Sequence, residues 1–169
     1  MNNTVRIAFS VLLVAGVSAC AKKTNVKPPV AAENPPVAET QPVESGRYTR
    51  DSLDTDSCLR QRVVYFDLDK TEIKPEFQAQ IACHAEYLRQ FPDARVTLEG
   101  NTDERGSREY NLGLGERRGN AVQGALGAAG ASSAQLNVTS YGEERPVCRQ
   151  HDESCWSKNR RVEIVYTAK

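Results

Sequence analysis

Residues 100–119 constrain this chain most, because they join a strand-like run to a helical pattern through a polar turn. Apolar and polar residues alternate over 95–99, and apolar residues over 114–129 then recur at helical spacing. At about 100° per residue, Arg118 falls near the middle of that apolar stripe. An inward guanidinium is costly unless an acid or a bound anion meets it, and Asp103 in the turn is such an acid. The sequence therefore predicts that Asp103 and Arg118 form a pair where a strand meets a helix.

Hydrophobic periodicity predicts further elements on both sides of this stretch. The expected strands cover residues 63–67, 94–99, 136–141 and 162–166. The first expected helix begins near Pro75, a residue that suits a first helical turn, and ends at 91–93. The second carries Arg118 and ends at 127–130, and a third is a turn or two at 154–160.

The order of these elements predicts an α/β (α+β) two-layer sandwich, with helices packed on a mixed sheet of about four strands. The helix that carries Arg118 contains several glycines, each of which weakens a helix by roughly 1 kcal/mol relative to alanine. We expect Gly119 and Gly124 to allow this helix to approach the sheet closely.

The first residues have the pattern of a secretory leader. A short basic start precedes an apolar run over 7–17, which is too short to cross a bilayer as a helix. Small residues then lead to Cys20, as in the bacterial lipoprotein box, so we expect residues 1–19 to be a signal peptide and Cys20 to be lipidated. Two or more acyl chains would make the attachment lasting. The alternative is an ordinary secretory signal followed by an incidental cysteine.

Residues 20–57 are rich in proline and alanine and show neither helical nor strand periodicity. Such a segment buries too little apolar surface to offset the cost of ordering, and proline keeps it extended. We therefore expect a flexible, disordered tether over 20–57, followed by one folded domain over 58–169.

The composition excludes several functions. The chain has 22 basic and 22 acidic residues, so no long-range field attracts DNA, and nucleic-acid binding is disfavoured. His84 and His151 lie far apart without the spacing of metal ligands. No paired acid and base and no activated nucleophile stands out. The sequence indicates a protein that is not an enzyme and uses no metal or other cofactor.

Four cysteines remain besides Cys20, and a leader would place them in an oxidising compartment where disulfides form. Four cysteines allow three pairings. The short separation of Cys148 and Cys155 favours a bond between them, which leaves Cys58 to pair with Cys83. The other two pairings stay open, and a redox or metal role lacks a Cys-x-x-Cys spacing.

Four separated blocks of the chain also carry a resemblance to a known family. These blocks are residues 64–70, residues 101–106 with 110–111 and 114–118, residues 140–146, and residues 151–153 with 157–161. In this order they resemble OmpA-like peptidoglycan-binding domains, and more narrowly the lipoproteins of the Tol–Pal system. The resemblance covers about residues 60–166.

The resemblance implies non-covalent binding of the diaminopimelate residue of peptidoglycan stem peptides. The free end of diaminopimelate carries an ammonium and a carboxylate. Asp103 would accept from the ammonium, and Arg118 would bind the carboxylate in a bidentate manner. Backbone N–H groups near a helix start favour the anionic end. The other residues implied to form the site are Asp69, Thr102, Arg105, Gly106, Asn111 and Leu114, with Thr102 the weaker candidate.

The resemblance also implies a place in the cell. The chain would be attached by its lipid anchor to the periplasmic face of the outer membrane. Ala21, the residue after Cys20, fits that destination. The implied protein partners are TolB and, as a further candidate, TolA, in a system needed for envelope integrity and for outer-membrane constriction at cell division. Alternatives are an OmpA-like lipoprotein outside that system, a metal-dependent periplasmic hydrolase built on acids such as Asp67, and a plain structural ion pair of Asp103 with Arg118.

Two further interpretations concern residues near the implied site. Tyr110 is expected to serve packing rather than ligand contact. The run Asn159-Arg160-Arg161 is either a helix cap with solvated charges or a rim of the site, and we favour a cap that supports the domain.

Overall fold

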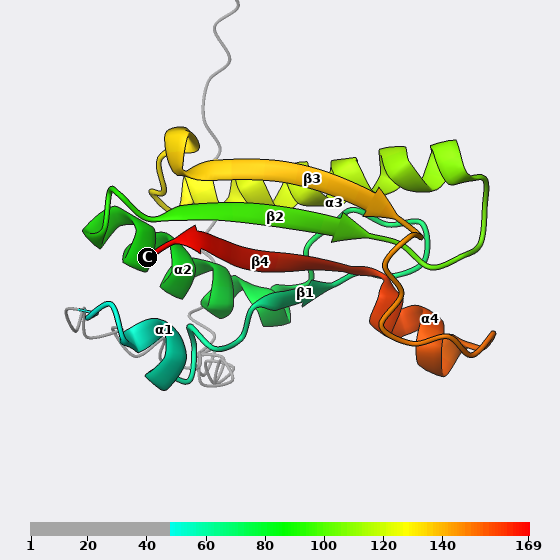
Figure 1. Ribbon diagram of the computed structural model, residues 1–169, viewed down its shortest axis with the longest axis horizontal. Coiled ribbons are helices and arrows are strands. Elements are labelled where there is room, and N and C mark those ends of the chain that lie inside the picture. Colours follow the sequence, from blue (N-terminus) through cyan, green and yellow to red (C-terminus); the bar gives the residue numbers. More distant parts are fainter. Residues whose placement is uncertain (1–47) are drawn as a thin grey trace, which may run out of the picture. The chain divides into compact units, whose positions relative to one another are not determined.

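A four-stranded mixed sheet forms the centre of the computed structural model, which describes residues 48–169 (Figure 1). The strands are β1 (Val63–Tyr65), β2 (Arg95–Asn101), β3 (Leu136–Gly142) and β4 (Arg161–Ala168). Their order in the sheet is β1-β4-β2-β3. β2 and β3 run parallel, whereas β4 is antiparallel to both β1 and β2. The C-terminal end of β2 and the N-terminal end of β4 therefore lie next to each other, at the same end of the sheet.

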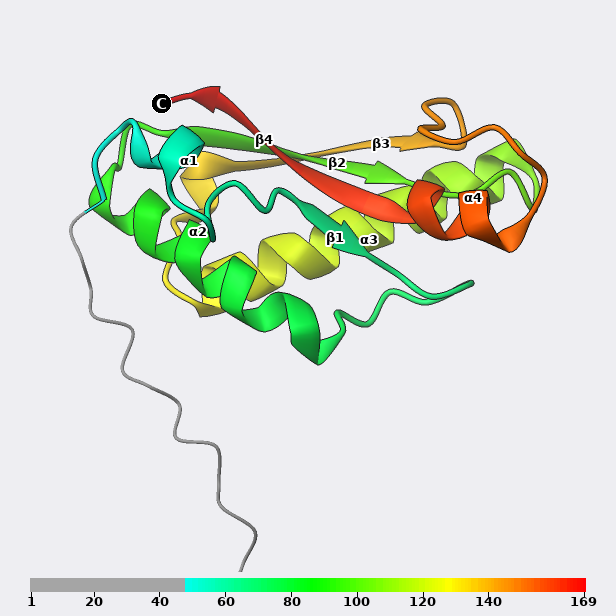
Figure 2. The ribbon, with the colours of Figure 1, turned by 90° about the horizontal axis from the view of Figure 1, so that it is seen from below.

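Two long helices cover one face of this sheet (Figure 2). α2 (Gln78–Gln90) follows a 3₁₀ turn (Pro75–Phe77) that has proline at its first position. α3 (Arg108–Ala128) begins after Ser107, whose hydroxyl accepts from the N–H of Tyr110 and so caps the helix. The shorter elements are α1 (Ser52–Thr55), the 3₁₀ turn Ser133–Gln135 and α4 (Glu153–Asn159). The expected two-layer sandwich with a mixed sheet is confirmed.

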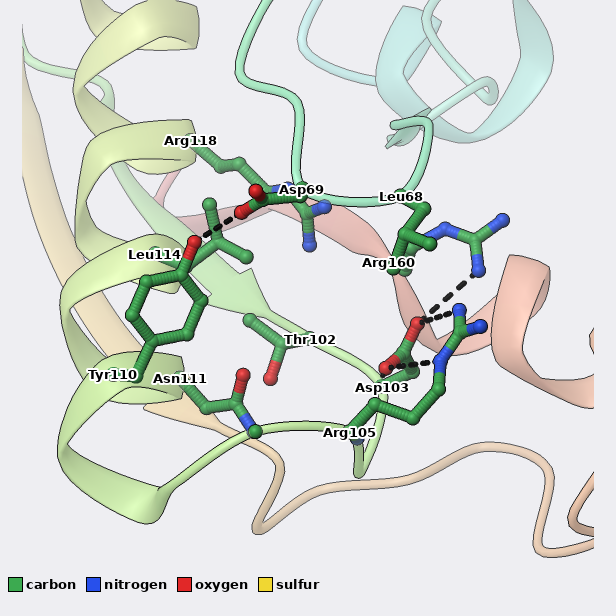
Figure 3. Close-up of a pocket in the computed structure, with 11 residues that line it drawn as sticks. Leu68, Asp69, Thr102, Asp103, Arg105, Tyr110, Asn111, Leu114, Arg118 and Arg160 are labelled. Carbon is green, nitrogen blue, oxygen red and sulfur yellow. Dashed lines mark hydrogen bonds and ion pairs between the residues drawn. The ribbon is translucent and has the colours of Figure 1, made fainter.

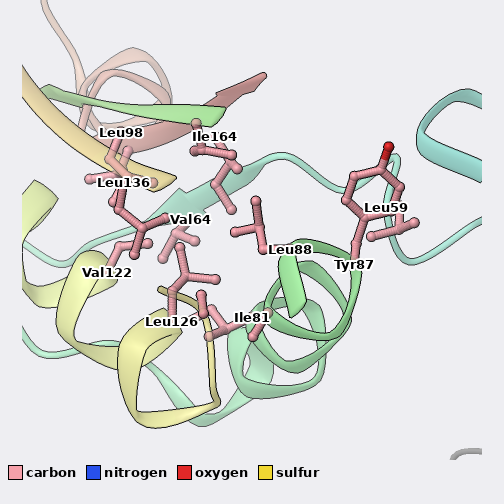
Figure 4. Packing of buried hydrophobic residues seen from close by; sticks show 14 of the residues in the cluster. Leu59, Val64, Ile81, Tyr87, Leu88, Leu98, Val122, Leu126, Leu136 and Ile164 are labelled. Atoms are coloured by element: carbon pink, nitrogen blue, oxygen red, sulfur yellow. The ribbon is translucent and has the colours of Figure 1, made fainter. Parts of the chain in front are cut away.

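The hydrophobic core lies between the sheet and the two long helices (Figure 4). Each element contributes the apolar positions that its periodicity predicts, and burial of a large aliphatic side chain contributes roughly 1.5–3 kcal/mol. The buried core includes Val64, Ile81, Leu88, Leu98, Val122, Leu126, Leu136 and Ile164. This core holds α3 against β2, which is the junction that carries the site.

Glycines bring α3 and β2 into backbone contact. A Cβ atom on Gly100 would lie only 2.0 Å from the carbonyl oxygen of Gly115, so neither strand nor helix has room for a side chain there. A Cβ on Gly119 would lie 2.5 Å from Cγ1 of Val138, in line with the close approach expected at Gly119. Gly124 has nothing within 4 Å of its Cβ position, so the same expectation was wrong for Gly124.

The folded domain begins earlier than expected. Residues 48–57 were assigned to the tether, yet Leu53 in α1 is fully buried in the core. Arg50 also forms an ion pair with Asp93, at 2.7 Å. A helix of four residues is too short to produce a detectable periodicity, which explains the wrong boundary at residue 57. The signal peptide, Cys20 and the tether up to residue 47 lie outside the described residues.

Two disulfides are present, Cys58–Cys83 and Cys148–Cys155. They are the two pairs that the cysteine spacing favoured. The first ties the segment before β1 to α2, and the second closes the loop that leads into α4. Within residues 48–169, no helix is long and apolar enough to cross a membrane.

Candidate functional site

A cavity of about 320 Å³ opens at the edge of the sheet where β2 ends and α3 begins (Figure 3). The loop after β1 forms one side, α3 forms the other, and the residue before β4 closes it. The lining residues are Leu68, Asp69, Thr102, Asp103, Arg105, Gly106, Tyr110, Asn111, Leu114, Arg118 and Arg160. All eight peptidoglycan-binding residues implied by the resemblance are among them.

The turn from β2 into α3 is built by local hydrogen bonds. The N–H of Thr102 donates to the carbonyl of Gly142 at 2.8 Å, which extends the contact with the end of β3. The carboxylate of Asp103 then accepts from the N–H of Arg105 at 3.0 Å, as Asp side chains do in turns. Gly106 follows with φ 116°, a conformation that favours glycine. This turn aims the Asp103 side chain into the cavity instead of along the sheet.

Asp103 is held between two arginines (Figure 3). Its carboxylate is only 3% exposed, and it accepts from Arg105 Nη2 at 2.7 Å, Arg105 Nε at 3.2 Å and Arg160 Nη1 at 3.1 Å. Burial alone would raise the pKa of Asp103, but the hydrogen bonds from Arg105 and Arg160 outweigh it and hold the pKa below its usual value. A carboxylate offers roughly four acceptor positions, and the two arginines with the turn N–H occupy all of them.

Arg118 is fully buried and bonds to the backbone. Its Nε donates to the carbonyl of Lys70 at 2.9 Å, and its two terminal nitrogens donate to those of Asn101 at 3.1 Å and Asp67 at 3.0 Å. Burial lowers the pKa of the guanidinium to about 10, and the charge of Arg160 adds to this effect, so Arg118 is still protonated at pH 7. A guanidinium has five N–H donors, so these three carbonyls leave two of them without a partner among residues 48–169, and Arg118 lines the cavity.

Asp103 and Arg118 meet at the junction of β2 with α3, as predicted, but they form no direct ion pair, so the alternative of a structural ion pair between them was wrong. Among residues 48–169, Asp103 forms its ion pairs with Arg105 and Arg160, and Arg118 forms none. The two side chains nevertheless line one cavity, and Asp103 still raises the pKa of Arg118 through space. Helical periodicity placed Arg118 on the inward face correctly, but it could not show that backbone carbonyls would satisfy the guanidinium.

Asp69 stands on the opposite rim of the cavity, in the loop after β1. It has φ 56° and is the only non-glycine residue with positive φ in the described part of the chain. Aspartate tolerates this left-handed conformation better than most residues, and such backbone strain often marks a functional position. The exposed carboxylate accepts from the hydroxyl of Tyr110 (Figure 3). In contrast to Asp103, the Asp69 carboxylate has no further hydrogen-bond or ion-pair partner within residues 48–169, and it lines the cavity.

Three further lining residues carry no charge. The hydroxyl of Thr102 is buried and has no hydrogen-bond partner within residues 48–169. The amide of Asn111 donates to Glu143, and Leu114 supplies an apolar wall from α3. Thr102 thus brings a polar oxygen without a partner among the described residues to the lining of the cavity.

The sequence did not predict Leu68 and Tyr110 as lining residues, whereas Arg160 occupies the rim position that was the alternative to its role as a cap. Leu68 and Tyr110 are 52% and 45% exposed, and large exposed apolar side chains beside a cavity are the signal that structure adds. Arg160 is the C-cap residue of α4, as expected, because its N–H donates to the carbonyl of Trp156, and its buried side chain also donates to Asp103, to Glu153 and to the carbonyl of Phe66.

The cavity therefore presents both signs of charge in a small volume. Its lining includes two carboxylates, Asp69 and Asp103, and three arginines, Arg105, Arg118 and Arg160, which leaves one positive charge in excess. No group of histidine, cysteine, aspartate and glutamate side chains within residues 48–169 is arranged to hold a metal ion. The arrangement suits a small zwitterionic or anionic ligand.

Comparison with known proteins places the chain in a family. The model of the OmpA family matches residues 65–160. A peptidoglycan-associated lipoprotein from Pseudomonas putida is 51% identical over 114 residues, which cover 67% of this chain and 68% of that protein. A protein of the same name from Brucella melitensis is 33% identical over 159 residues, 94% of this chain and 90% of that one.

Solved structures agree with this assignment. The crystal structure of the peptidoglycan-associated lipoprotein from Burkholderia pseudomallei is similar with a TM-score of 0.67 and 44% identity. The similarity covers 68% of this chain and 98% of that one. The chain therefore belongs to the OmpA family, in the group of the peptidoglycan-associated lipoproteins.

Proposed function

We propose that the cavity binds the diaminopimelate residue of peptidoglycan stem peptides without a covalent bond. The observation that carries this proposal is the presence of two carboxylates and three arginines in one cavity of about 320 Å³. The free end of diaminopimelate has an ammonium and a carboxylate on one carbon atom, so it matches a site that offers both charges a few ångströms apart. The family membership supports a cell-wall ligand.

The hydrogen bonds of the cavity suggest how the ligand lies in it. Asp69 has free acceptor positions and is exposed, so it is the better partner for the ammonium, with the charge of Asp103 behind it. The carboxylate lies toward Arg118, which has two N–H groups left, and toward Gly106 at the start of α3. This modifies the roles expected from sequence, because Asp103 orders the arginines and contributes charge rather than a free oxygen.

The proposed activity is binding without bond cleavage. A general acid needs a pKa near the working pH, whereas the arginines hold the pKa of Asp103 below its usual value. An enzyme of the cell wall would release soluble muropeptides from purified sacculi, and we expect none to be released.

We further propose that this binding attaches the outer membrane to the cell wall. The leader pattern supports a signal peptide over 1–19 and lipidation of Cys20, which would anchor the chain on the periplasmic face. The tether would then extend from residue 20 to about residue 47 and end at the folded domain. The group to which the chain belongs supports TolB, and TolA as a further candidate, as protein partners in envelope integrity and cell division. Co-precipitation with TolB tests this part of the proposal.

A sacculus pull-down tests the binding proposal. Asp69→Asn removes one charge from an exposed residue and leaves the core intact, so we expect it to lose most binding while circular dichroism stays unchanged. Asp93→Asn is the matched control, since Asp93 is exposed and precedes the start of β2, at the far end of that strand. Equal binding by wild type, Asp69→Asn and the control would contradict the proposed ligand contact.

A further inference from the structure

A second cavity, of about 270 Å³, adjoins the first. Tyr65 and Asp67 line it from the end of β1, Lys74 and Glu76 from the turn before α2, and Lys158 and Arg160 from the end of α4. Arg160 lines both cavities, and the proposed function of the first makes no use of the second. Both volumes lie near the lower end of the range for sites that hold small organic groups.

The chain segment over residues 66–70 lies between the two cavities. Hydrogen bonds from two buried arginines hold its backbone in place. Arg160 donates to the carbonyl of Phe66 at 3.0 Å, and Arg118 donates to the carbonyls of Asp67 and Lys70. Along this segment Leu68 faces the first cavity and Asp67 the second. Since two buried arginines hold this segment, the two cavities keep a constant separation.

The second cavity favours an anionic group. Lys158 is exposed and forms no ion pair within residues 48–169, so its charge is available. Lys74 lies 3.6 Å from both Asp67 and Glu76, which are loose pairs that leave donors free. The ring of Tyr65, which is partly exposed, offers an apolar surface beside these cations. A carboxylate on a small apolar body fits these groups.

We infer that the second cavity binds a backbone carboxylate of the amino acid next to diaminopimelate in the same stem peptide. This inference rests on the proposed function of the first cavity. A stem peptide has such carboxylates on the γ-linked D-glutamate and on the terminal D-alanine, and both flank diaminopimelate. Arg160 lines both cavities, so a carboxylate joined by a short covalent link to the zwitterionic end in the first cavity gains effective concentration at the second if that link spans the two. The second cavity therefore distinguishes a stem peptide from an isolated diaminopimelate unit.

Calorimetric titration of the full chain with two probes tests the inference. The first probe is diaminopimelate whose other end is a neutral N-acetyl methylamide, so that only the zwitterionic end is charged. The second is the stem tetrapeptide L-alanyl-γ-D-glutamyl-diaminopimelyl-D-alanine. Lys158→Glu should weaken tetrapeptide binding about fivefold, as expected for an exposed charge pair, and leave binding of the capped probe unchanged. The difference should shrink at high salt, because exposed charges are screened.

Lys169→Glu is the matched control, because it makes the same charge change at the end of β4 away from α4 (Figure 1). It should leave the binding of both probes at the wild-type value. The inference is overturned if wild type binds both probes equally, or if Lys158→Glu binds the tetrapeptide as wild type does. In both results the capped probe still binds, so the proposed function stands. Failure of wild type to bind either probe would overturn the proposed function as well.

Discussion

Asp103 and Arg160 form a buried ion pair between the end of β2 and the start of β4, with Oδ2 and Nη1 3.1 Å apart. The two side chains are only 4% and 6% exposed, although the residues lie 57 positions apart in the sequence. Antiparallel pairing of β2 with β4 brings these two strand ends together. The pair ties the cavity to the sheet, and it satisfies part of the hydrogen-bonding capacity of Asp103.

Replacement of Arg160 by glutamine should destabilise the protein strongly. The change removes the hydrogen bonds that the Arg160 side chain donates to Asp103 and to the carbonyl of Phe66, and a hydrogen bond to a charged group contributes about 1.5–3 kcal/mol. Urea denaturation would measure the loss. Arg50→Gln is the control, since its pair with Asp93 is exposed and should change stability much less. Equal losses of unfolding free energy for the two variants would show that the buried ion pair stabilises the protein no more than the exposed one does.

Two glycine-to-alanine changes should have opposite effects. Gly100→Ala places a Cβ 2.0 Å from the carbonyl oxygen of Gly115, so α3 must move away from β2, at a cost of about 1–3 kcal/mol or more. Gly124→Ala meets nothing within 4 Å and improves helix propensity, so it should stabilise the protein by about 0.5–1 kcal/mol. Thermal denaturation of both variants checks the close contact, and the same sign for both would contradict it.

His84 should make stability depend on pH. It is fully buried, its Nε2 lies 2.9 Å from the carbonyl oxygen of Gln61, and its Nδ1 lies 2.9 Å from the hydroxyl of Tyr166. Because a carbonyl only accepts, Nε2 donates and the neutral ring accepts from Tyr166. Burial lowers the pKa of His84 to about 4, whereas the unfolded chain has a pKa near 6.5.

The sign of this effect follows from proton binding. Between pH 6.5 and about 4 the unfolded chain binds a proton at His84 and the folded chain does not, so stability falls as the pH is lowered. The loss should approach about 3 kcal/mol over this range. Denaturation curves at several pH values measure it, and His84→Gln should lack this component. An identical pH slope for wild type and His84→Gln would refute the assignment.

Leu53 should contribute to stability, although it lies before residue 58, where the sequence predicts that the folded domain begins. Truncation of a fully buried leucine removes apolar contacts and leaves a cavity, so Leu53→Ala should cost about 2–5 kcal/mol. Leu68→Ala is the matched control, because Leu68 is exposed and its loss should stay within about 0.5 kcal/mol. If Leu53→Ala unfolds at the same denaturant concentration as wild type, residues 48–57 behave as tether.

Periodicity predicted most of the fold because the apolar positions of strands and long helices repeat. The spacing of Val162, Ile164 and Tyr166 predicted β4, and the stripe that ends near residue 129 predicted α3. α1 escaped detection because four residues complete barely one helical turn. The order of the strands in the sheet could not be predicted from periodicity either, since it depends on contacts between residues far apart in the chain.

The site was only partly predictable, for a related reason. The polar turn and the inward position of Arg118 are local features, and both were found. The choice of partners is not local, because Asp103 meets Arg160 across two strands and Arg118 meets carbonyls of the loop after β1. Sequence alone could place opposite charges near one junction, but only the structure shows which of them stay free for a ligand.

A crystal structure of the chain with a diaminopimelate-containing stem peptide would test the central claim most directly. We predict that the ammonium of the free diaminopimelate end lies within hydrogen-bond distance of Asp69. The adjacent carboxylate should face Arg118 and the turn at Gly106. A peptide bound elsewhere on the domain, or a cavity left empty at saturating peptide, would contradict the account.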